Sequence, residues 1–256
     1  ATLMIVAVIL HQIRVFFTGA YRKPREINWI VGMCLLFATL MTGFTGYSLV
    51  YEQLSFWGAT VGANIADSLP VVGTFMKRMM LAGDAYNQST LSRFFILHAA
   101  VLPVTIIMLL VVHISIIRLQ GVTEFKFQDE DEGVQKTFNF FPDHLYTEIL
   151  IGLVLMVVLS ALATILPATL GPEANPLQTP EVIKPEWFFY PAFRWLKLFS
   201  VTFAVLSTGF IVFVMFVWPF IDRWLREKTR FPEASVWVGI AAVFALVGLT
   251  LWEAVA

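Results

Sequence analysis

Apolar residues dominate five stretches of this chain, and each stretch is long enough to cross a lipid bilayer. A membrane-spanning helix needs about 20 predominantly apolar residues. The pattern therefore predicts spans at residues 27–50, 94–117, 145–167, 198–221 and 234–254. A sixth apolar run, residues 1–17, has neither a charged leading region nor a small-residue cleavage site, which argues against a signal peptide. The expected fold class is all-α, a polytopic transmembrane helix bundle.

Composition supports the same class. Hydrophobic residues make up 58% of the chain and charged residues only 14%, whereas soluble domains are closer to half and a quarter. The net charge of −1 gives no sign of a nucleic-acid partner. Cys34 is the only cysteine, so neither a disulfide framework nor a cysteine metal site is available. We expect a multi-pass protein whose main surroundings are membrane lipid.

Three polar connections separate the spans. Residues 51–93 contain two short amphipathic stretches, at 59–69 and 72–82. Residues 119–143 carry mixed charges typical of a solvated linker, and residues 168–193 are rich in proline. The positive-inside rule places most basic residues, and the linker, on one side of the membrane, which we take as the cytoplasmic n-side. The 51–93 and 168–193 connections then lie on the opposite p-side.

Histidines occur at helical spacing inside the membrane. His98 and His113 lie in one span, 15 residues apart, so they face roughly the same way and stand about 22 Å apart along the axis. His11 lies at the depth of His113 in the run 1–17. Intramembrane ionisable groups are costly and usually functional, and imidazole is a common haem ligand. The pattern indicates two stacked haems, although a hydrogen bond to a neighbouring helix explains any one histidine equally well.

Two glycines in the span 27–50 have nearly the same spacing as His98 and His113. Gly32 and Gly46 are 14 residues apart, which is about 21 Å along a helix. A porphyrin edge needs a backbone without a side chain in the way, whereas small residues also serve ordinary helix packing. The match with the histidine spacing favours two haems.

The segment KPEWFFYPAF, residues 184–193, places Glu186 among prolines and aromatic rings in a p-side connection. By itself it favours an interfacial ion pair of Glu186 with Lys184 or Arg194. The alternative is a general base, because an apolar site disfavours a charged carboxylate and so promotes proton uptake near neutral pH.

Several motifs in order carry a family resemblance. The segments HQIRVFFTGAYRKPRE, GYSLVYEQLSFWGATV, SLPVVGTFM, TLSRFFILHAAVLPV and GPEANPLQTPEVIKPEWFF resemble cytochrome b of the bc-type quinol–cytochrome c oxidoreductases over essentially the whole chain. The TGAYRKPRE loop and the 15-residue histidine step are similar to the chloroplast and cyanobacterial b–f branch, in which the two halves are separate polypeptides. Here they look fused: a haem-binding half at 1–121, lacking the first span and part of the second, a linker at 122–143, and a quinol-binding half of three spans at 144–256.

The resemblance implies a haem arrangement. His11 and His113 match the ligands of the high-potential haem near the n-side. His98 matches one ligand of the low-potential p-side haem, whose partner we expect about 14 residues before His11, beyond the start of this chain. Arg14 and Arg93 match arginines beside haem propionates, and Gly32 and Gly46 match the glycines beside the porphyrins.

The resemblance also implies two quinone sites. Pro185, Glu186, Trp187 and Phe188 match the PEWY motif of quinol oxidation, in which the carboxylate accepts a proton. Phe188 replaces the family tyrosine, and the family's LPW reads Leu-Val-Tyr at residues 49–51, so the pocket departs from the pattern.

Near the n-side, Arg118 and Glu148 lie where the family binds quinone, although an ion pair at two helix ends also explains them. His144, near the same face, is a weaker candidate for that site.

The implied function is oxidation of quinol at the p-side, with electrons passing through two b-type haems to quinone at the n-side, coupled to proton translocation. Implied partners are a Rieske iron–sulfur protein, a c-type cytochrome and a second copy in a homodimer, in a bacterial cytoplasmic membrane. Two rivals remain open: a dihaem membrane anchor of a quinone-linked dehydrogenase, and a proton-coupled transporter that binds no haem.

Overall fold

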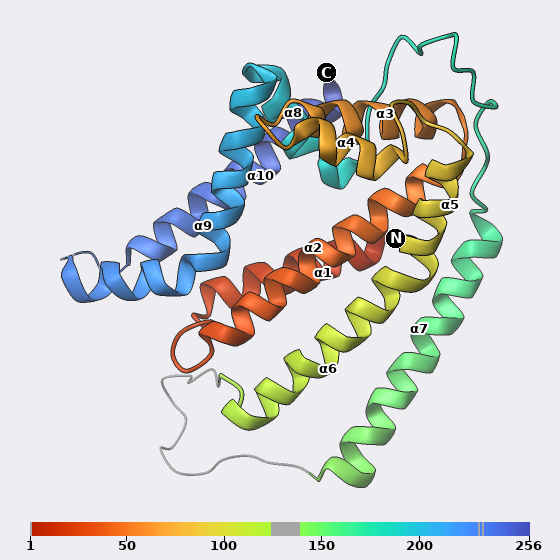
Figure 1. Cartoon of the computed structure of the whole chain (residues 1–256). Helices are drawn as coiled ribbons and strands as arrows, with labels where there is room; N and C mark the ends of the chain where they lie inside the picture. Colours follow the sequence, from red (N-terminus) through yellow and green to blue (C-terminus); the bar gives the residue numbers. More distant parts are fainter. Residues whose placement is uncertain (1, 124–138, 230, 232) are drawn as a thin grey trace. The chain divides into compact units, whose positions relative to one another are not determined.

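The structure is a computed structural model that describes residues 2–123, 139–229, 231 and 233–256 (Figure 1). The chain divides into two compact units, unit 1 with Ala1–Thr123 and Pro172–Ala256, and unit 2 with Glu124–Gly171. The regular elements among the described residues are helices, together with an isolated bridge between Glu52 and Glu173. The predicted all-α fold class is confirmed.

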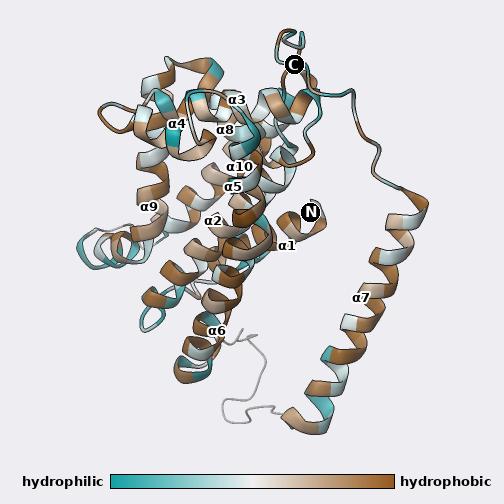
Figure 2. Ribbon diagram, turned by 45° about the vertical axis from the view of Figure 1, so that its right-hand side comes forward, coloured by the Kyte–Doolittle hydropathy of each residue, from teal (hydrophilic) through white to brown (hydrophobic). Residues whose placement is uncertain are grey.

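Among the described residues, five helical segments are long and apolar enough to cross a membrane. They are α2 (Glu26–Ser48), the segment of α5 (Gln88–Ile96), η1 (Leu97–Val101) and α6 (Leu102–Gln120), the segment of η2 (Phe140–His144) and α7 (Leu145–Ile165), α9 (Val201–Lys228), and α10 (Ala234–Val255). Figure 2 shows apolar residues along these helices and polar residues gathered toward their ends. The five predicted spans are confirmed.

Helix ends follow local capping rather than the membrane boundary. α5 begins six residues before the predicted span because the Asn87 side chain accepts hydrogen bonds from the backbone of Ser89 and Thr90. α3 (Gln53–Asp67) begins earlier than the predicted amphipathic stretch because Glu52 and Ser55 form a capping box. α4 (Gly73–Leu81) agrees with the predicted stretch 72–82.

The core of unit 1 lies where the α1–α2 connection meets α2 and α9. Trp29 donates its indole N–H to the Met215 carbonyl at 2.8 Å, and Trp218 donates to the Tyr21 hydroxyl at 3.2 Å. These rings are nearly fully buried, together with Met33. Burying large aromatic side chains whose polar atoms are satisfied contributes strongly to stability, so this end of the bundle is firmly held. α1 (Thr2–Phe17) packs on α2 and on α10.

The two connections predicted to lie on the p-side, called here the p-side connections, reach across unit 1. α3 and α4 lie over the end of α2 (Figure 1). The proline-rich connection leads into η3 (Trp187–Phe189) and α8 (Tyr190–Leu198), and α8 packs against α10.

Unit 2 consists, in its described part, of η2 and α7. Almost every α7 side chain is exposed within its unit, and a helix that is apolar all round requires lipid or other helices as surroundings. The predicted linker, 122–143, falls mostly on residues 124–138, which lie outside the described residues.

Candidate functional site

α2 forms one wall of the candidate haem site because its glycines face the histidines of the neighbouring segment. A Cβ placed on Gly32 would lie 3.5 Å from Cε1 of His113, which is ordinary contact. A Cβ placed on Gly46 would lie 2.6 Å from Cε1 of His98, which real side chains do not tolerate. The structure therefore pairs each glycine with the histidine at its own depth.

A π turn explains how two histidines 15 residues apart can each face one of two glycines that are 14 residues apart. His98 lies in η1, a π-helical turn directly before α6. Pro103, near the start of α6, has no N–H to donate to the preceding turn, which favours this irregularity. A π turn holds one residue more than an α turn and is frequent at functional sites. The extra residue brings His98 and His113 back into register with Gly46 and Gly32.

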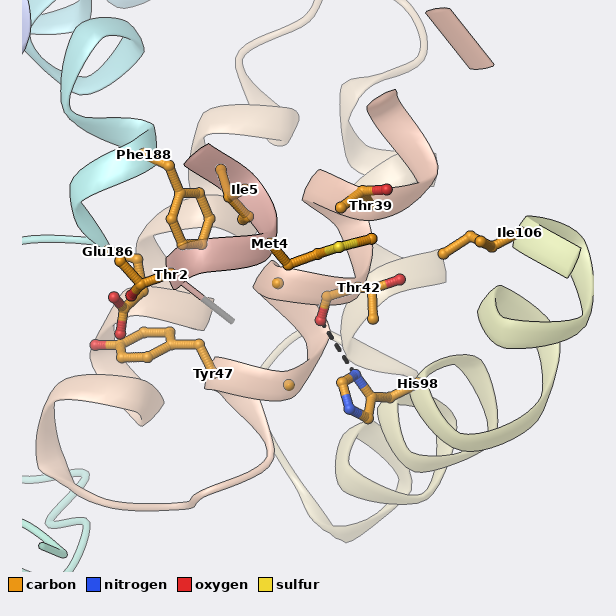
Figure 3. A pocket seen from close by; sticks show the side chains of 12 residues that line it. Thr2, Met4, Ile5, Thr39, Thr42, Tyr47, His98, Ile106, Glu186 and Phe188 are labelled. Carbon is orange, nitrogen blue, oxygen red and sulfur yellow. Dashed lines mark hydrogen bonds between the residues drawn. The ribbon is translucent and has the colours of Figure 1, made fainter. Parts of the chain in front are cut away.

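The His98 ring is fixed through its Nδ1 atom. This nitrogen lies 3.1 Å from the Thr42 carbonyl oxygen and 3.2 Å from Oγ1 of Thr45 (Figure 3). A carbonyl oxygen only accepts, so Nδ1 carries the hydrogen. Nε2 then keeps its lone pair, which is the state needed for coordination of a metal.

A cavity of about 400 Å³ adjoins His98, within the usual size range of ligand sites. It is lined by Thr2, Met4, Ile5, Thr39, Thr42, Gly43, Gly46, Tyr47, His98, Ile106, Glu186 and Phe188 (Figure 3). The lining is mainly apolar, with few polar groups. The cavity thus joins the histidine of the candidate haem site to the carboxylate of the proline-rich connection.

Glu186 enters this cavity just before η3. Phe189 donates its backbone N–H to the Glu186 carbonyl at 2.8 Å, which turns the chain after the carboxylate. The Glu186 carboxylate points toward the Tyr47 hydroxyl (Figure 3), and that hydroxyl is buried without a hydrogen-bond partner among the described residues. The Phe188 ring packs against Gly43, where a Cβ would lie 2.9 Å from its Cζ.

The cationic side chains near Glu186 in the sequence contact a different residue, Glu253. Arg194 lies 3.6 Å from Glu253 of α10, and Lys197 pairs with the same side chain. Lys184 donates to the Glu253 carbonyl at 3.1 Å. Neither Lys184 nor Arg194 makes an ion pair with Glu186 within the described part of the chain, so the interfacial pair considered from the sequence is not formed. Glu253 is fully buried, and sequence reasoning did not identify it.

A second contact that the sequence did not reveal holds the start of the proline-rich connection. Gln53 of α3 donates its backbone N–H to the Pro172 carbonyl at 2.8 Å and its side-chain amide to the Gln178 carbonyl. The Gln53 side-chain oxygen accepts from the Asn175 backbone at 2.6 Å. Gln53 therefore links the two p-side connections through its backbone N–H and its side-chain amide.

The histidines predicted to lie toward the n-side, His11 and His113, have a different environment. Nδ1 of His113 is buried and has no hydrogen-bond partner among the described residues; the Asn28 backbone beside the ring lies outside hydrogen-bond geometry. His11, on α1, is close enough to His113 for a coulombic interaction between the rings when charged. That these two side chains share one haem stays a prediction.

The predicted arginines and the n-side pair lie apart from this cavity. Arg93 donates to the Met79 carbonyl at 2.8 Å, at the carboxyl end of α4, and Arg14 is exposed in the last turn of α1. Arg118 belongs to unit 1 and Glu148 to unit 2, where Glu148 lies 3.9 Å from His144. Their haem and quinone roles stay predictions.

Tyr86 contacts the end of α2 from the 51–93 connection. Its hydroxyl donates to the Ser48 carbonyl at 2.8 Å, at the end of α2. Burial raises the pKa of Tyr86 to about 12, and Tyr51 nearby adds to the shift. Tyr86 is therefore a neutral donor that ties the 51–93 connection to α2.

The residues fit a haem better than a bare metal ion. Among the described residues, no group of three or more His, Cys, Asp or Glu side chains gathers to hold an ion. Haem iron needs only one or two axial ligands from the protein. A lone imidazole with its Nδ1 hydrogen-bonded, facing a glycine beside a cavity, matches that requirement.

Comparison with known proteins identifies the family of the chain. The family model described as Cytochrome b(N-terminal)/b6/petB matches residues 2–173, and the one described as Cytochrome b(C-terminal)/b6/petD matches residues 173–255. The chain belongs to the cytochrome b/b6 family. The predicted resemblance, with both parts in one chain, is confirmed; a division into halves at 121 and 144 stays a prediction.

Relatives within the cytochrome b/b6 family include several bacterial proteins. The chain is 50% identical over 124 residues to cytochrome b6 of Heliobacterium mobile, covering 48% of this chain and 58% of the relative. It is 32% identical over 255 residues to the cytochrome bc complex cytochrome b subunit of Chlorobaculum thiosulfatiphilum (96% and 59%), and 36% identical over 224 residues to cytochrome b of Cereibacter sphaeroides (83% and 50%). The chain thus spans between half and three-fifths of these relatives.

A solved structure shares the fold. A chain titled "Hyperthermophilic respiratory Complex III" superposes with a TM-score of 0.81 at 24% sequence identity, covering 99% of this chain and 69% of that chain.

Proposed function

We propose that this member of the cytochrome b/b6 family is the haem-bearing core of a bc-type quinol–cytochrome c oxidoreductase in a bacterial cytoplasmic membrane. The observation that carries the proposal is the cavity shared by His98 and Glu186. Quinol oxidation needs an electron acceptor and a proton acceptor at one place, and this cavity joins a residue suited to each task.

The histidines would hold the two haems. His98, with its Nδ1 hydrogen engaged, would present Nε2 to the p-side haem. His11 and His113 would share the n-side haem. When bound, the haems supply one-electron transfer between the two membrane faces.

Glu186 would take the proton at the p-side. Oxidation of one quinol yields a quinone, two electrons and two protons, and a carboxylate oxygen of Glu186 accepts one of the protons from a quinol hydroxyl. The carboxylate is suited to this because it faces an apolar cavity and because the cations of α8 are engaged by Glu253. The half-buried Phe188 and Trp187 rings restrict water at the same point.

The remaining steps involve other surfaces. One quinol electron would leave to a Rieske iron–sulfur protein docked at the p-side and then to a c-type cytochrome, in a complex built as a homodimer. Two quinol oxidations at the p-side would send two electrons to the n-side, where one quinone takes them up with two protons to become quinol, with Arg118 and Glu148 as candidate proton donors. The net result is proton release at one face and uptake at the other.

Turnover of a Glu186→Gln variant tests the proposal. Glutamine keeps the size of the side chain but cannot accept the proton, so quinol oxidation by the purified complex should fall at least about 100-fold, the usual range for loss of a general base. The b-haem spectrum should stay unchanged. Glu181→Gln is the control, because Glu181 is exposed in the same connection and does not line the cavity.

Unchanged turnover in Glu186→Gln would show that Glu186 is not the proton acceptor in quinol oxidation. Copurification provides the second arm, because a bc-type complex brings an iron–sulfur protein and a c-type cytochrome with this chain. Purification with a dehydrogenase subunit instead would favour the membrane-anchor reading, and absence of any b-type absorption band would favour a transporter.

A further inference from the structure

The buried Thr45 hydroxyl lies beside the candidate haem ligand His98. Thr45 is 2% exposed, and its Oγ1 lies 3.2 Å from Nδ1 of His98. The Thr42 carbonyl lies 3.1 Å from the same nitrogen. One N–H group of the imidazole therefore faces two oxygens of α2.

The direction of the Thr45–His98 contact follows from the hydrogens available. The Thr45 hydroxyl has one hydrogen, and it donates that hydrogen to the Met41 carbonyl at 2.9 Å. Its lone pairs remain free to accept. Because Nδ1 of His98 must donate to the Thr42 carbonyl, the same N–H is shared with the Thr45 oxygen.

This arrangement is particular to Thr45 among neighbouring threonines. Thr39 and Thr42 also donate to carbonyls one turn back, at 2.8 Å each, as threonines in helices commonly do. Of these three threonines, Thr45 is the one whose hydroxyl also reaches the His98 imidazole. Gly46, the next residue, lets the ring approach α2 closely enough for that contact.

His98 and His113 differ in the hydrogen bonding of their Nδ1 atoms. Nδ1 of His113 has no hydrogen-bond partner among the described residues, whereas Nδ1 of His98 has two acceptors. A hydrogen bond accepted from a ligand's second nitrogen raises the basicity of the ligating nitrogen. A more basic ligand stabilises the oxidised iron and lowers the reduction potential.

We propose that Thr45 is a positioning residue that orients His98 and lowers the reduction potential of the p-side haem relative to the n-side haem. The inference rests on the proposed function, because it requires a haem at His98. It adds a physical source for the ordering of the two potentials within this chain.

Redox titration of the b-type absorbance in the purified complex tests the inference. Thr45→Val removes the hydroxyl at nearly constant shape, and Thr45→Ser keeps it. In Thr45→Val, the midpoint potential of the p-side haem should rise; a tenfold change in its reduction equilibrium corresponds to about 59 mV for one electron. Thr45→Ser should titrate like the parent complex, and the n-side haem should be unaffected in both.

The controls separate the possible failures. Thr250→Val removes a hydroxyl that donates to a carbonyl on α10, at 2.7 Å, away from any histidine, and should shift neither potential. Loss of the p-side haem in Thr45→Val but not in Thr45→Ser would support the orienting role. Two haems with unchanged potentials in Thr45→Val would overturn this inference alone, whereas a parent complex without b-type absorbance would overturn the proposed function.

Discussion

At the residue scale, Gly46 is a position where the structure leaves no room for a side chain beside His98. Its missing side chain allows the His98 ring to lie against α2, and an added Cβ would lie 2.6 Å from that ring. The clash involves a ring whose position is already fixed by Thr42 and Thr45. The close approach therefore depends on glycine.

We predict that Gly46→Ala displaces His98 and removes the p-side haem. The pyridine haemochrome assay should then give about one b haem per chain where the parent complex gives two. Gly248→Ala on α10, where a Cβ would meet nothing within 4 Å, is the matched control and should keep both. Two haems with parental spectra in Gly46→Ala would show that the ring position is not constrained in this way.

Some site residues were predictable from spacing alone and others were not. Helical periodicity fixes which residues share a face, so His98, His113, Gly32 and Gly46 could be paired from the sequence. The π turn that completes their register was not foreseen. The partners of Glu253 and Gln53 are separated from them by long stretches of chain, and no local pattern encodes such contacts.

At the scale of elements, α8 is held to α10 by one buried carboxylate. Glu253 is fully buried against Arg194 and Lys197, and Arg194 also lies over the Trp252 ring at 3.9 Å. Removing one member of a buried ion pair leaves the other charge uncompensated. The position of α8 directly after the Glu186 motif links this pair to the cavity.

We predict that Glu253→Gln destabilises unit 1 by about 3 kcal/mol, the lower end of the range for a broken buried pair because Lys197 is partly exposed. Thermal unfolding in detergent should shift to lower temperature, and the KM for quinol should rise as α8 loosens. Glu233→Gln, at the start of α10 and without a buried cation, is the control. Equal stability of the two variants would contradict the anchoring role.

The α3–α4 pair contains a carboxylate with a pH-dependent contribution. Asp67 accepts hydrogen bonds from Thr74 at 3.0 Å and Lys77 at 3.2 Å, and these bonds hold its pKa below the ordinary value of 3.8. A lowered pKa in the folded state means that the stabilisation is present above the unfolded-state value and is lost as pH falls through the folded-state value.

We therefore predict that the α3–α4 pair loosens in acid, below about pH 4. The protection factors of the amides in residues 68–77, which are corrected for the pH dependence of intrinsic exchange, should fall there in the parent chain. In Asp67→Asn these protection factors should be low at every pH, with no transition; a variant that retained the acid transition would assign it to another group.

At the scale of the whole molecule, the number and extent of the spans followed from length and apolar content, because the bilayer sets both. Helix ends differed from the expected ones where capping residues such as Asn87 and Glu52 extend the helix beyond the apolar core. The cavity was not predictable, since it needs α1, α2, η1 and the proline-rich connection to converge.

The central claim is that imidazoles of this chain hold two b haems, one toward each membrane face. Redox titration of the b-type absorbance in a His113→Ala complex tests it most directly, with His144→Ala as the control. The account predicts two one-electron transitions in the parent and control complexes, and only the lower-potential p-side transition in His113→Ala. Two undiminished transitions in His113→Ala would contradict it.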